Sequence, residues 1–265
     1  MDTGVFRMTV LGTRGSMAVD GPDYMEFGGA TSCYMVQAGG ETVFLDAGSG
    51  LLGAPSEFER TPVILLSHLH LDHLLGLGMY PRLSRKGQRT RLLVPVNPGE
   101  DPLQLLDQYY APPFWPLSLS GYSGENVIEP LSFPLQIGEM TVDGVPGNHP
   151  GGCAAMRVSC GGRSLVYLTD YEYSKDSFER MTVFAEGADL ILYDGQYTAE
   201  EAEQKKGFGH STAGWGMELM RRSGARRLLL VHHDPQAKDA EIRAREAAIH
   251  RSDVRYARKG DVISL

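Results

Sequence analysis

Short apolar runs of strand length recur through the first part of the chain, and glycine or polar residues bound each of them. Runs rich in β-branched, aromatic and aliphatic residues are typical of β-strands. The pair Gly39-Gly40 fits the tight turn of a hairpin between the second and third runs. The predicted strands cover residues 6–11, 32–37, 42–45 and 62–66, and the last is a continuous apolar run that indicates a buried strand.

The second half of the chain mixes strand patterns with helical patterns. A helix is also predicted at 74–83, directly after the fourth strand, despite two glycines in it. Strands early in each half, with helices added later, favour an α+β fold in which two sheets pack on each other with helices outside. No break in composition divides the 265 residues, so we expect one domain, 1–265. The further predicted strands are 140–142, 155–158, 164–168, 190–193 and 227–231, and the further helices are 175–186, 198–205, 212–222 and 237–250.

One segment, residues 95–125, departs from this pattern because it is rich in proline and aromatic residues. Long loops are usually functional or disordered, so this segment is a candidate lid or subunit contact. As a subunit contact it would make the protein a homodimer. The alternative is that its aromatic side chains only pack the loop onto the body of the protein.

The net charge of −8 and the three cysteines restrict the classes of function. The acidic balance disfavours an extended nucleic-acid surface but leaves a small phosphorylated substrate open. No two cysteines form a C-x-x-C pair, which argues against a thiolate zinc site and for a reducing compartment. The first ten residues lack an apolar run, and nowhere does the chain approach the roughly 20 apolar residues of a membrane span. We therefore expect a cytoplasmic protein without membrane contact.

The densest cluster of residues that can bind a metal lies in the run Ser67–His73, S-H-L-H-L-D-H, directly after the fourth predicted strand. Side chains alternate along a strand, so His68 and His70 can point the same way, while Asp72 and His73 begin the next helix and face a neighbouring point. Two imidazoles can then bind one metal, and a carboxylate with an imidazole can bind a second. Such ligands suit zinc, iron or manganese. A single histidine here would be an ordinary hydrogen-bonded residue, but three with an acid within six residues are hard to explain in that way.

Further histidines and aspartates follow other predicted strands or lie in glycine-rich loops. Polar groups that collect at strand ends mark the rim where a site is built. His250, late in an amphipathic helix, fits an ordinary surface residue. The rim candidates are Asp46, His149, Asp170, His210, His232 and His233.

The motif H-x-H-x-D-H after a buried strand, with Asp46 before it and single histidines and an aspartate after it, resembles the metallo-β-lactamase superfamily over essentially the whole chain. The resemblance implies a four-layer αβ/βα sandwich with a two-metal site at one edge of its sheets. It implies two divalent metal ions, with zinc expected and manganese or iron as alternatives. Asp46 would support the histidine loop without binding metal, although a turn-capping role fits it equally well. By position, one metal would be bound by His68, His70 and His149 and the other by Asp72, His73 and His232, with Asp170 bridging them.

At two positions the sequence differs from well-known members, and these differences limit which branch of the superfamily it resembles. Asp170 stands where the best-known zinc β-lactamases carry cysteine, which disfavours drug hydrolysis. His70 stands where the diiron oxygen-reducing members typically have glutamate, which disfavours redox chemistry. Both departures favour hydrolysis.

The segment Gly209-His210-Ser211-Thr212, followed by an apolar strand and a histidine, resembles ribonuclease Z, the tRNA 3′-end endonuclease branch, and related small phosphodiesterases. In that branch this histidine meets the scissile phosphate. Ser211 or Thr212 can cap a helix whose free N–H groups attract an oxyanion. The alternative is that Ser211 only caps the helix and His210 only packs.

Only twenty residues, 150–169, separate His149 from Asp170, and a hairpin at Gly161-Gly162 fills them. Ribonuclease Z carries a long tRNA-gripping arm in that interval. The spacing therefore argues against tRNA and favours a small phosphodiester, such as a cyclic nucleotide or a ribose cyclic phosphate. The densest basic patch elsewhere is most simply a solvated turn, and it comprises Arg82, Arg85, Lys86, Arg89 and Arg91.

Three residues are candidates for contact with the substrate. Arg14 follows the first predicted strand, where it could meet the phosphate or lie exposed in a hairpin. Ser211 belongs to the segment just described. His232 is the expected metal ligand because it comes first after its strand, which leaves the adjacent His233 to line the pocket or make a hydrogen bond.

The predicted reaction is hydrolysis by a water that two metals about 3.5–4 Å apart share, which lowers its pKa from 15.7 towards about 7. The resulting hydroxide attacks phosphorus in line while the metals offset the phosphoryl charge. Asp72 and His210 are the predicted catalytic residues: Asp72 handles a proton, and His210 stabilises the oxyanion or protonates the leaving oxygen. Two rivals remain, a lactone, carboxyl-ester or thioester hydrolase on the same metals, and a non-catalytic metal-binding accessory protein of a biosynthetic pathway.

Overall fold

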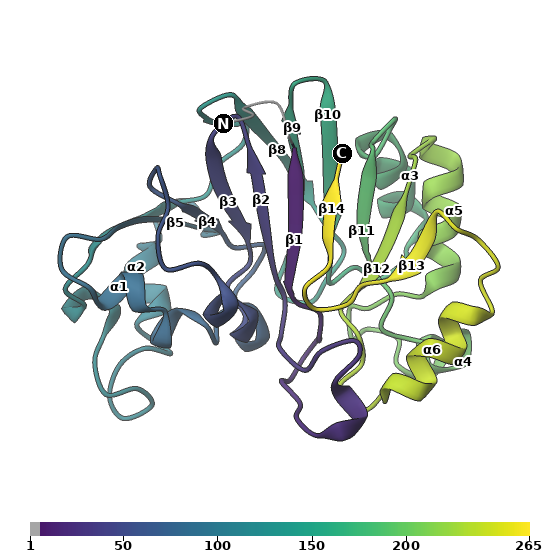
Figure 1. Ribbon diagram of the computed structural model, residues 1–265, viewed down its shortest axis with the longest axis horizontal. Helices are drawn as coiled ribbons and strands as arrows, with labels where there is room; N and C mark the ends of the chain where they lie inside the picture. The colour runs from purple at the N-terminus through teal and green to yellow at the C-terminus, as the bar shows by residue number, and fades with distance from the viewer. Residues whose placement is uncertain (1–5) are drawn as a thin grey trace.

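The computed structural model describes residues 6–265, and two seven-stranded sheets that face each other form its centre (Figure 1). The strand orders are β14-β1-β2-β3-β4-β5-β6 and β13-β12-β11-β10-β9-β8-β7. The first sheet contains β1 (Arg7–Gly12), β2 (Cys33–Ala38), β3 (Glu41–Leu45), β4 (Val63–Leu65), β5 (Arg89–Val94), β6 (Glu125–Pro130) and β14 (Val262–Ser264). The second contains β7 (Leu135–Ile137), β8 (Met140–Pro146), β9 (Ala154–Cys160), β10 (Arg163–Leu168), β11 (Leu190–Asp194), β12 (Leu228–Val231) and β13 (Val254–Tyr256).

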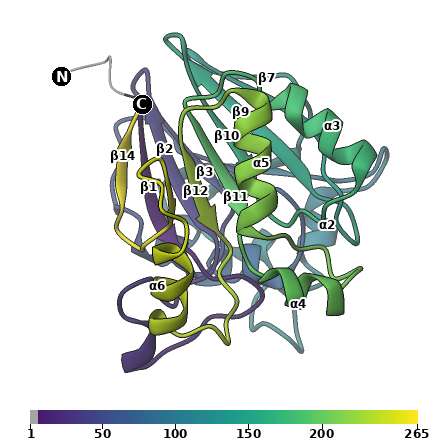
Figure 2. The ribbon, with the colours of Figure 1, turned by 90° about the vertical axis from the view of Figure 1, so that its right-hand side faces the viewer.

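Helices lie outside the sheets and at one end of them (Figure 2). The α-helices are α1 (Pro81–Ser84), α2 (Pro102–Leu106), α3 (Lys175–Phe184), α4 (Ala199–Gln204), α5 (Ala213–Ser223) and α6 (Asp239–Ala247). The short 3-10 helices are η1 (Pro22–Tyr24), η2 (Ser49–Gly53), η3 (Leu71–His73), η4 (Leu77–Met79) and η5 (Leu119–Gly121).

Alternate residues of the strands build different cores, because successive side chains point to opposite faces of a sheet. Val43 and Leu45 of β3 belong to the core between the two sheets, while Phe44 belongs to the outer core formed with η2, η4 and α1. In β11, Leu192 faces the inner core, and Tyr193 belongs to the outer core that α3 and α5 cover. The layers therefore run helix, sheet, sheet, helix, and the predicted αβ/βα sandwich is confirmed.

Parallel strands place aspartate and histidine side chains at one edge of each sheet. Strands β3 to β6 run parallel, and so do β10 to β13. The carboxyl ends of parallel neighbours meet at the same edge, where open α/β sheets place their ligands. Asp46 directly follows β3, Asp170 lies two residues after β10, Asp194 ends β11, and His232 directly follows β12.

The predicted helix 74–83 is wrong. This stretch instead contains η4, then an extended Tyr80, then the start of the four-residue α1. The residue before a proline is biased away from helical backbone, so Pro81 ends the first turn and starts the second.

The basic patch around Arg82 and Arg89 is not simply a solvated turn. Part of the patch belongs to β5, and Arg82 is buried and donates to the carbonyls of Ser56 and Arg89.

The segment 95–125 packs onto the outer layer of the first sheet. Leu106, Tyr110 and Leu119 are buried in that layer's core, and the Tyr110 hydroxyl donates to the carbonyl of Leu74 at 2.5 Å. Its aromatic residues thus attach the segment to the body of the protein, which is the simpler of the two interpretations.

A single domain over 1–265 stays a prediction, since residues 1–5 lie outside the described part. None of the helices within residues 6–265 is both long and apolar enough to cross a membrane.

Candidate metal centre

Three of the residues at the sheet edge adopt left-handed backbone. Asp46, Asp170 and His232 have φ values of 62°, 50° and 61°. Residues other than glycine rarely adopt such φ values, and they cluster at functional sites where the surrounding structure holds them. All three lie at or just after the carboxyl ends of β3, β10 and β12, and Asp170 and His232 supply ligand atoms to the centre.

The first group of ligand atoms comes from His68, His70, His149 and Asp170, which lie within 4.8 Å of one another. The loop after β4 supplies the first two histidines, and the β8–β9 loop supplies His149. Nε2 of His149 lies 3.1 Å from Nδ1 of His70. Nε2 of His68 and Nε2 of His149 each lie 3.8 Å from Oδ1 of Asp170.

The second group comes from Asp72, His73, Asp170 and His232, all of them buried. Nε2 of His73 lies 3.1 Å from both Oδ2 of Asp72 and Oδ2 of Asp170. Nε2 of His232 lies 3.1 Å and 3.2 Å from the same two oxygens. Ligand atoms around tetrahedral zinc, with bonds of about 2.0–2.2 Å, lie roughly 3.3–3.6 Å apart, so these spacings are close to those of a metal site. Asp170 presents one oxygen to each group.

The hydrogen bonds of the rings leave the inner nitrogens free for a cation. His73 donates from Nδ1 to Oδ2 of Asp46 at 2.7 Å, and His232 donates from Nδ1 to Oε1 of Gln196 at 2.8 Å. His149 donates from Nδ1 to the carbonyl of Gly209 at 2.9 Å. With the proton of each ring on Nδ1, Nε2 carries a lone pair toward the centre.

His68 has the same arrangement, with its proton on Nδ1 and Nε2 free for a cation. Its Nδ1 lies 3.0 Å from Oγ of Ser67, whose own proton is directed at Asp46. Nε2 of His68 is buried without a hydrogen-bond partner among the described residues. A buried polar atom without a partner is costly, and a metal ion at the first group would satisfy it. The donor set therefore fits divalent metal ions.

Asp46 lies behind the histidine loop and supports it. Its carboxylate accepts hydrogen bonds from the Ser67 backbone N–H at 2.6 Å, the Ser67 hydroxyl at 2.8 Å and the Tyr167 hydroxyl at 2.6 Å, besides the ring of His73. It is fully buried. A carboxylate in this position fixes both the tautomer and the orientation of a ligating histidine.

The carboxylates and imidazoles of the centre shift one another's pKa values. Burial opposes ionisation of Asp72 and Asp170, yet the neighbouring imidazoles hold the pKa of each carboxyl well below its usual range. Burial also opposes a charge on His232, but Asp170 and Asp72 raise the pKa of its ring to about 9. In His68, burial lowers the pKa. Positive charge is thus favoured at the second group, beside Asp72 and Asp170, where a divalent cation would supply it.

His210 lies beside the second group. Its ring stacks on that of His232 with centroids 4.9 Å apart, and its Nδ1 lies 2.9 Å from Oδ2 of Asp194. Asp194 is fully buried and lies 3.9 Å from Nδ1 of His232. Donation from Nδ1 to Asp194 leaves Nε2 of His210 as the second functional nitrogen of that ring.

The structure corrects the three predicted substrate contacts. Arg14 is fully buried and donates to the carbonyls of Gly28, Asp234 and Ala237, so it neither lies exposed nor reaches a ligand at the centre. Ser211 is buried, and its hydroxyl bonds to the hydroxyl of Tyr193. Thr212, rather than Ser211, caps α5.

His233 points away from the centre. Its Nε2 donates to the carbonyl of Ala257 at 2.7 Å, and its ring packs edge-on against Phe27. Burial lowers the pKa of this ring to about 3, so it stays neutral. Of the two interpretations of His233, the structure favours the hydrogen bond over lining of the pocket.

Sequence reasoning missed three residues that position this centre. Asp194 carried a usable signal, since it ends an apolar strand as Asp46 and Asp170 do. Gln196, which orients His232, carried none. Glu172 carried none either, although its carboxylate accepts from the backbone N–H groups of Gly207 and Gly209 and so holds the loop before His210.

Comparison with known proteins agrees with this architecture. Residues 41–233 match the family model of the β-lactamase superfamily domain. The probable metallo-hydrolase YhfI of Bacillus subtilis (strain 168) is 26% identical over 242 residues, which cover 88% of this chain and 92% of that protein. A ribonuclease Z of Ignicoccus hospitalis is 27% identical over 258 residues, covering 78% of this chain and 83% of the relative.

Solved structures share the fold. The crystal structure of YhfI superposes with a TM-score of 0.75 at 22% identity and covers 99% of this chain and 100% of its own. A diphosphatase from the PhnP family superposes with a TM-score of 0.73 at 18% identity over 98% of each chain. The family match spans well over half of the sequence and includes every residue of the centre from Asp46 to His232. The chain therefore belongs to the β-lactamase superfamily.

Proposed function

We propose that this chain is a metal-dependent phosphodiesterase whose substrate is a small phosphodiester, a cyclic nucleotide or a ribose cyclic phosphate being the expected kind. The observation that carries the proposal is the arrangement of Asp170 and His210. Asp170 directs one oxygen to each of two ligand groups, and Nδ1 of His210 lies 3.8 Å from one of those oxygens. Two cation sites can stabilise both the attacking and the leaving oxygen of an in-line displacement at phosphorus, and a further imidazole beside them can act on the leaving oxygen.

Two divalent cations, zinc being the expected kind, would supply an activated water and offset the charge on the phosphoryl oxygens. The residues of the chain do the rest. Asp72 is held by a hydrogen bond from the backbone N–H of Ser16 at 2.7 Å, which keeps its carboxylate oriented to take part in proton transfer. His210, fixed through Nδ1 by Asp194, has Nε2 left to stabilise the phosphoryl charge or to protonate the leaving oxygen.

The relatives favour phosphorus over a carboxyl carbon. One similar protein is a ribonuclease Z, and one solved structure with the same fold is a diphosphatase, and both names describe cleavage at phosphorus. For this chain we propose a small substrate, because β9 and β10 are joined directly by the turn at Gly161-Gly162 and no arm extends there. The net charge of −8 also disfavours a polynucleotide. A cytoplasmic location belongs to the same proposal.

The test combines metal analysis with a substrate screen. Protein purified without chelator is assayed on bis(p-nitrophenyl) phosphate, 3′,5′- and 2′,3′-cyclic nucleotides, lactones and thioesters. We expect turnover of at least one diester and none of the carboxyl substrates. Turnover of lactones or thioesters alone would replace the proposal with its carboxyl-ester rival. Absence of bound metal together with absence of turnover would favour the accessory-protein rival.

A further inference from the structure

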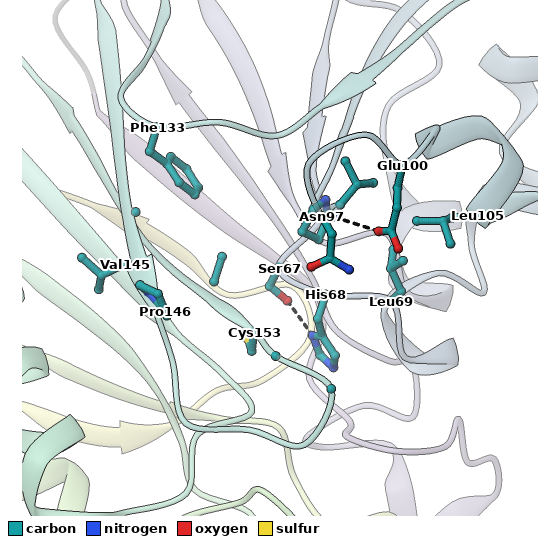
Figure 3. A pocket seen from close by; sticks show the side chains of 16 residues that line it. Ser67, His68, Leu69, Asn97, Glu100, Leu105, Phe133, Val145, Pro146 and Cys153 are labelled. Carbon is teal, nitrogen blue, oxygen red and sulfur yellow. Dashed lines mark hydrogen bonds between the residues drawn. The ribbon is translucent and has the colours of Figure 1, made fainter.

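A pocket of about 490 Å³ adjoins the first ligand group, and its position makes it a candidate for the part of the substrate that does not react (Figure 3). His68 lines it, as do Gly151 and Gly152 of the loop that carries His149. A group bound here would therefore lie directly beside the metal centre. Pockets of roughly 300–1,000 Å³ are the usual size for small organic ligands.

The segment 95–125 builds one wall of this pocket. Pro95, Val96, Asn97, Glu100 and Leu105 all line it. The segment is anchored a short way further along the chain, where Trp115 donates to the hydroxyl of Tyr122, which in turn donates to the carbonyl of Gly78. These bonds attach the segment that forms this wall to the body of the protein.

The wall is apolar apart from one pair of residues. The backbone N–H of Asn97 donates to the carboxylate of Glu100 at 2.8 Å, and this hydrogen bond lowers the pKa of that carboxyl. None of the described lining residues is a lysine or an arginine. A second phosphate would therefore meet a like charge here with no cation to offset it, whereas an uncharged group with N–H or O–H donors would be accepted.

An aromatic ring lies across the pocket from that pair (Figure 3). Phe133 is only partly buried, and its ring covers Gly144 of β8 so closely that a Cβ there would lie 2.2 Å from Cε2. The absence of a side chain at Gly144 therefore lets the ring rest on the strand. A phenyl ring that lines a pocket with apolar surroundings is a platform on which planar rings can stack.

We propose that this pocket binds an uncharged, ring-bearing group of about nucleoside size, esterified to the phosphate that the centre cleaves, and excludes groups that carry a second phosphate. This specificity rests on the proposed function, since it concerns the same reaction. Phe133 supplies the stacking surface, and Glu100 supplies both an acceptor for ring N–H or sugar hydroxyl groups and the repulsion against further anionic charge. The proposal thus narrows the substrate to a monoanionic diester of a neutral ring compound.

The test uses three diesters on the metal-loaded enzyme: methyl p-nitrophenyl phosphate, the p-nitrophenyl ester of thymidine 5′-phosphate, and the 3′-phosphorylated form of that ester. The quantity measured is the ratio of kcat/KM values between diesters. We expect wild type to favour the thymidine ester over the methyl ester by about tenfold or more, and Phe133→Ala to reduce that ratio by about tenfold. Phe133→Leu, which keeps apolar volume, reduces it as well. Phe114→Ala, an exposed phenylalanine outside the pocket, is the matched control and leaves the ratio unchanged.

The charge is tested separately with Glu100→Gln, and Glu139→Gln at an exposed site outside the pocket is its control. We expect Glu100→Gln to raise the relative rate of the 3′-phosphorylated ester about threefold at low salt, and the effect to shrink as salt screens the carboxylate. A wild-type ratio near one, or no effect of either Phe133 variant, would overturn the pocket proposal and leave the phosphodiesterase proposal standing. If no diester is cleaved, the phosphodiesterase proposal fails instead, and calorimetric titration with thymidine then decides the pocket: binding weakened by Phe133→Ala supports it, and no binding rejects it.

Discussion

The Nε2 atoms of His73 and His232 lie 3.4 Å apart at fully buried positions, and both rings donate from Nδ1 to partners outside the centre. Two lone pairs directed at one point repel each other unless a cation or protons lie between them. Asp72 and Asp170 add carboxylate oxygens to the same point. The second ligand group therefore suits a cation. Removing that cation should lower the stability of the whole fold.

Chelation should lower the thermal stability of the protein. A metal bound at a thousandfold excess over its Kd stabilises the native state by about 4 kcal/mol, which for a chain of this size corresponds to a Tm change on the order of 10 °C. Differential scanning calorimetry with and without chelator measures it, and added zinc should restore the Tm. A variant His73→Ala/His232→Ala is the control, since its Tm should respond much less. An equal response of that variant would place the stabilising metal elsewhere.

Asp46→Asn should weaken metal binding without removing a ligand. The amide cannot accept from His73, the Ser67 backbone, the Ser67 hydroxyl and Tyr167 together, so the ring of His73 loses its fixed tautomer. Loss of such a supporting partner typically costs about 10–100-fold in metal affinity. Competition with a chromophoric chelator measures the affinity. Tyr167→Phe, which leaves the carboxylate in place, should cost less; equal losses would mean that packing, not the carboxylate, sets the affinity.

His210→Ala should reduce kcat on phosphodiesters by about 10²–10⁴-fold while metal content stays at its wild-type value. Asp194→Asn should reduce kcat as well, because the 2.9 Å contact that orients His210 is weakened. The two effects should be less than additive, since both act through one ring. Metal analysis and steady-state kinetics on both single variants and the double variant check this. Full additivity would assign Asp194 a role apart from His210.

Gly15→Ala should displace a ligand from a position outside the ligand set. A Cβ at Gly15 would lie 2.2 Å from Nδ1 of His232, inside the contact distance of any real side chain. We expect the variant to lose metal from the second group and to lose diesterase activity. Gly53→Ala is the matched control, because a Cβ there meets no atom within 4 Å. Wild-type metal content in Gly15→Ala would show that the loop after β1 yields rather than His232.

The ligand residues could be predicted from the sequence because they are local in it. His68, His70 and Asp72 follow one apolar strand, Asp170 lies two residues after β10, and His232 directly follows β12, so strand ends mark them as candidates. The resemblance to the metallo-β-lactamase superfamily then assigns the ligand set, including His149, which lies in a loop. Asp194 obeys the strand-end rule as well, since it ends β11. The β-strand pattern likewise predicted most of the central strands within a residue or two at each end.

What escaped prediction depends on contacts between distant segments. Arg14 donates to the carbonyl of Gly28 and to carbonyls of the distant segment Asp234–Ala237, 220 and 223 residues away, so its burial has no local signal. Gln196 and Glu172 position His232 and the His210 loop through bonds that span 36 and 37 residues, again without local signal. The predicted helix 74–83 is wrong for a local reason, because Pro81 disfavours helical backbone at Tyr80.

The central claim, two cations acting together on a phosphodiester, is tested most directly by titrating metal into chelated, dialysed protein while following hydrolysis of bis(p-nitrophenyl) phosphate. The account predicts no turnover without metal and activity that saturates at two equivalents of zinc or manganese per chain. Turnover in the metal-free protein, or full activity at one equivalent with no further binding, would contradict it.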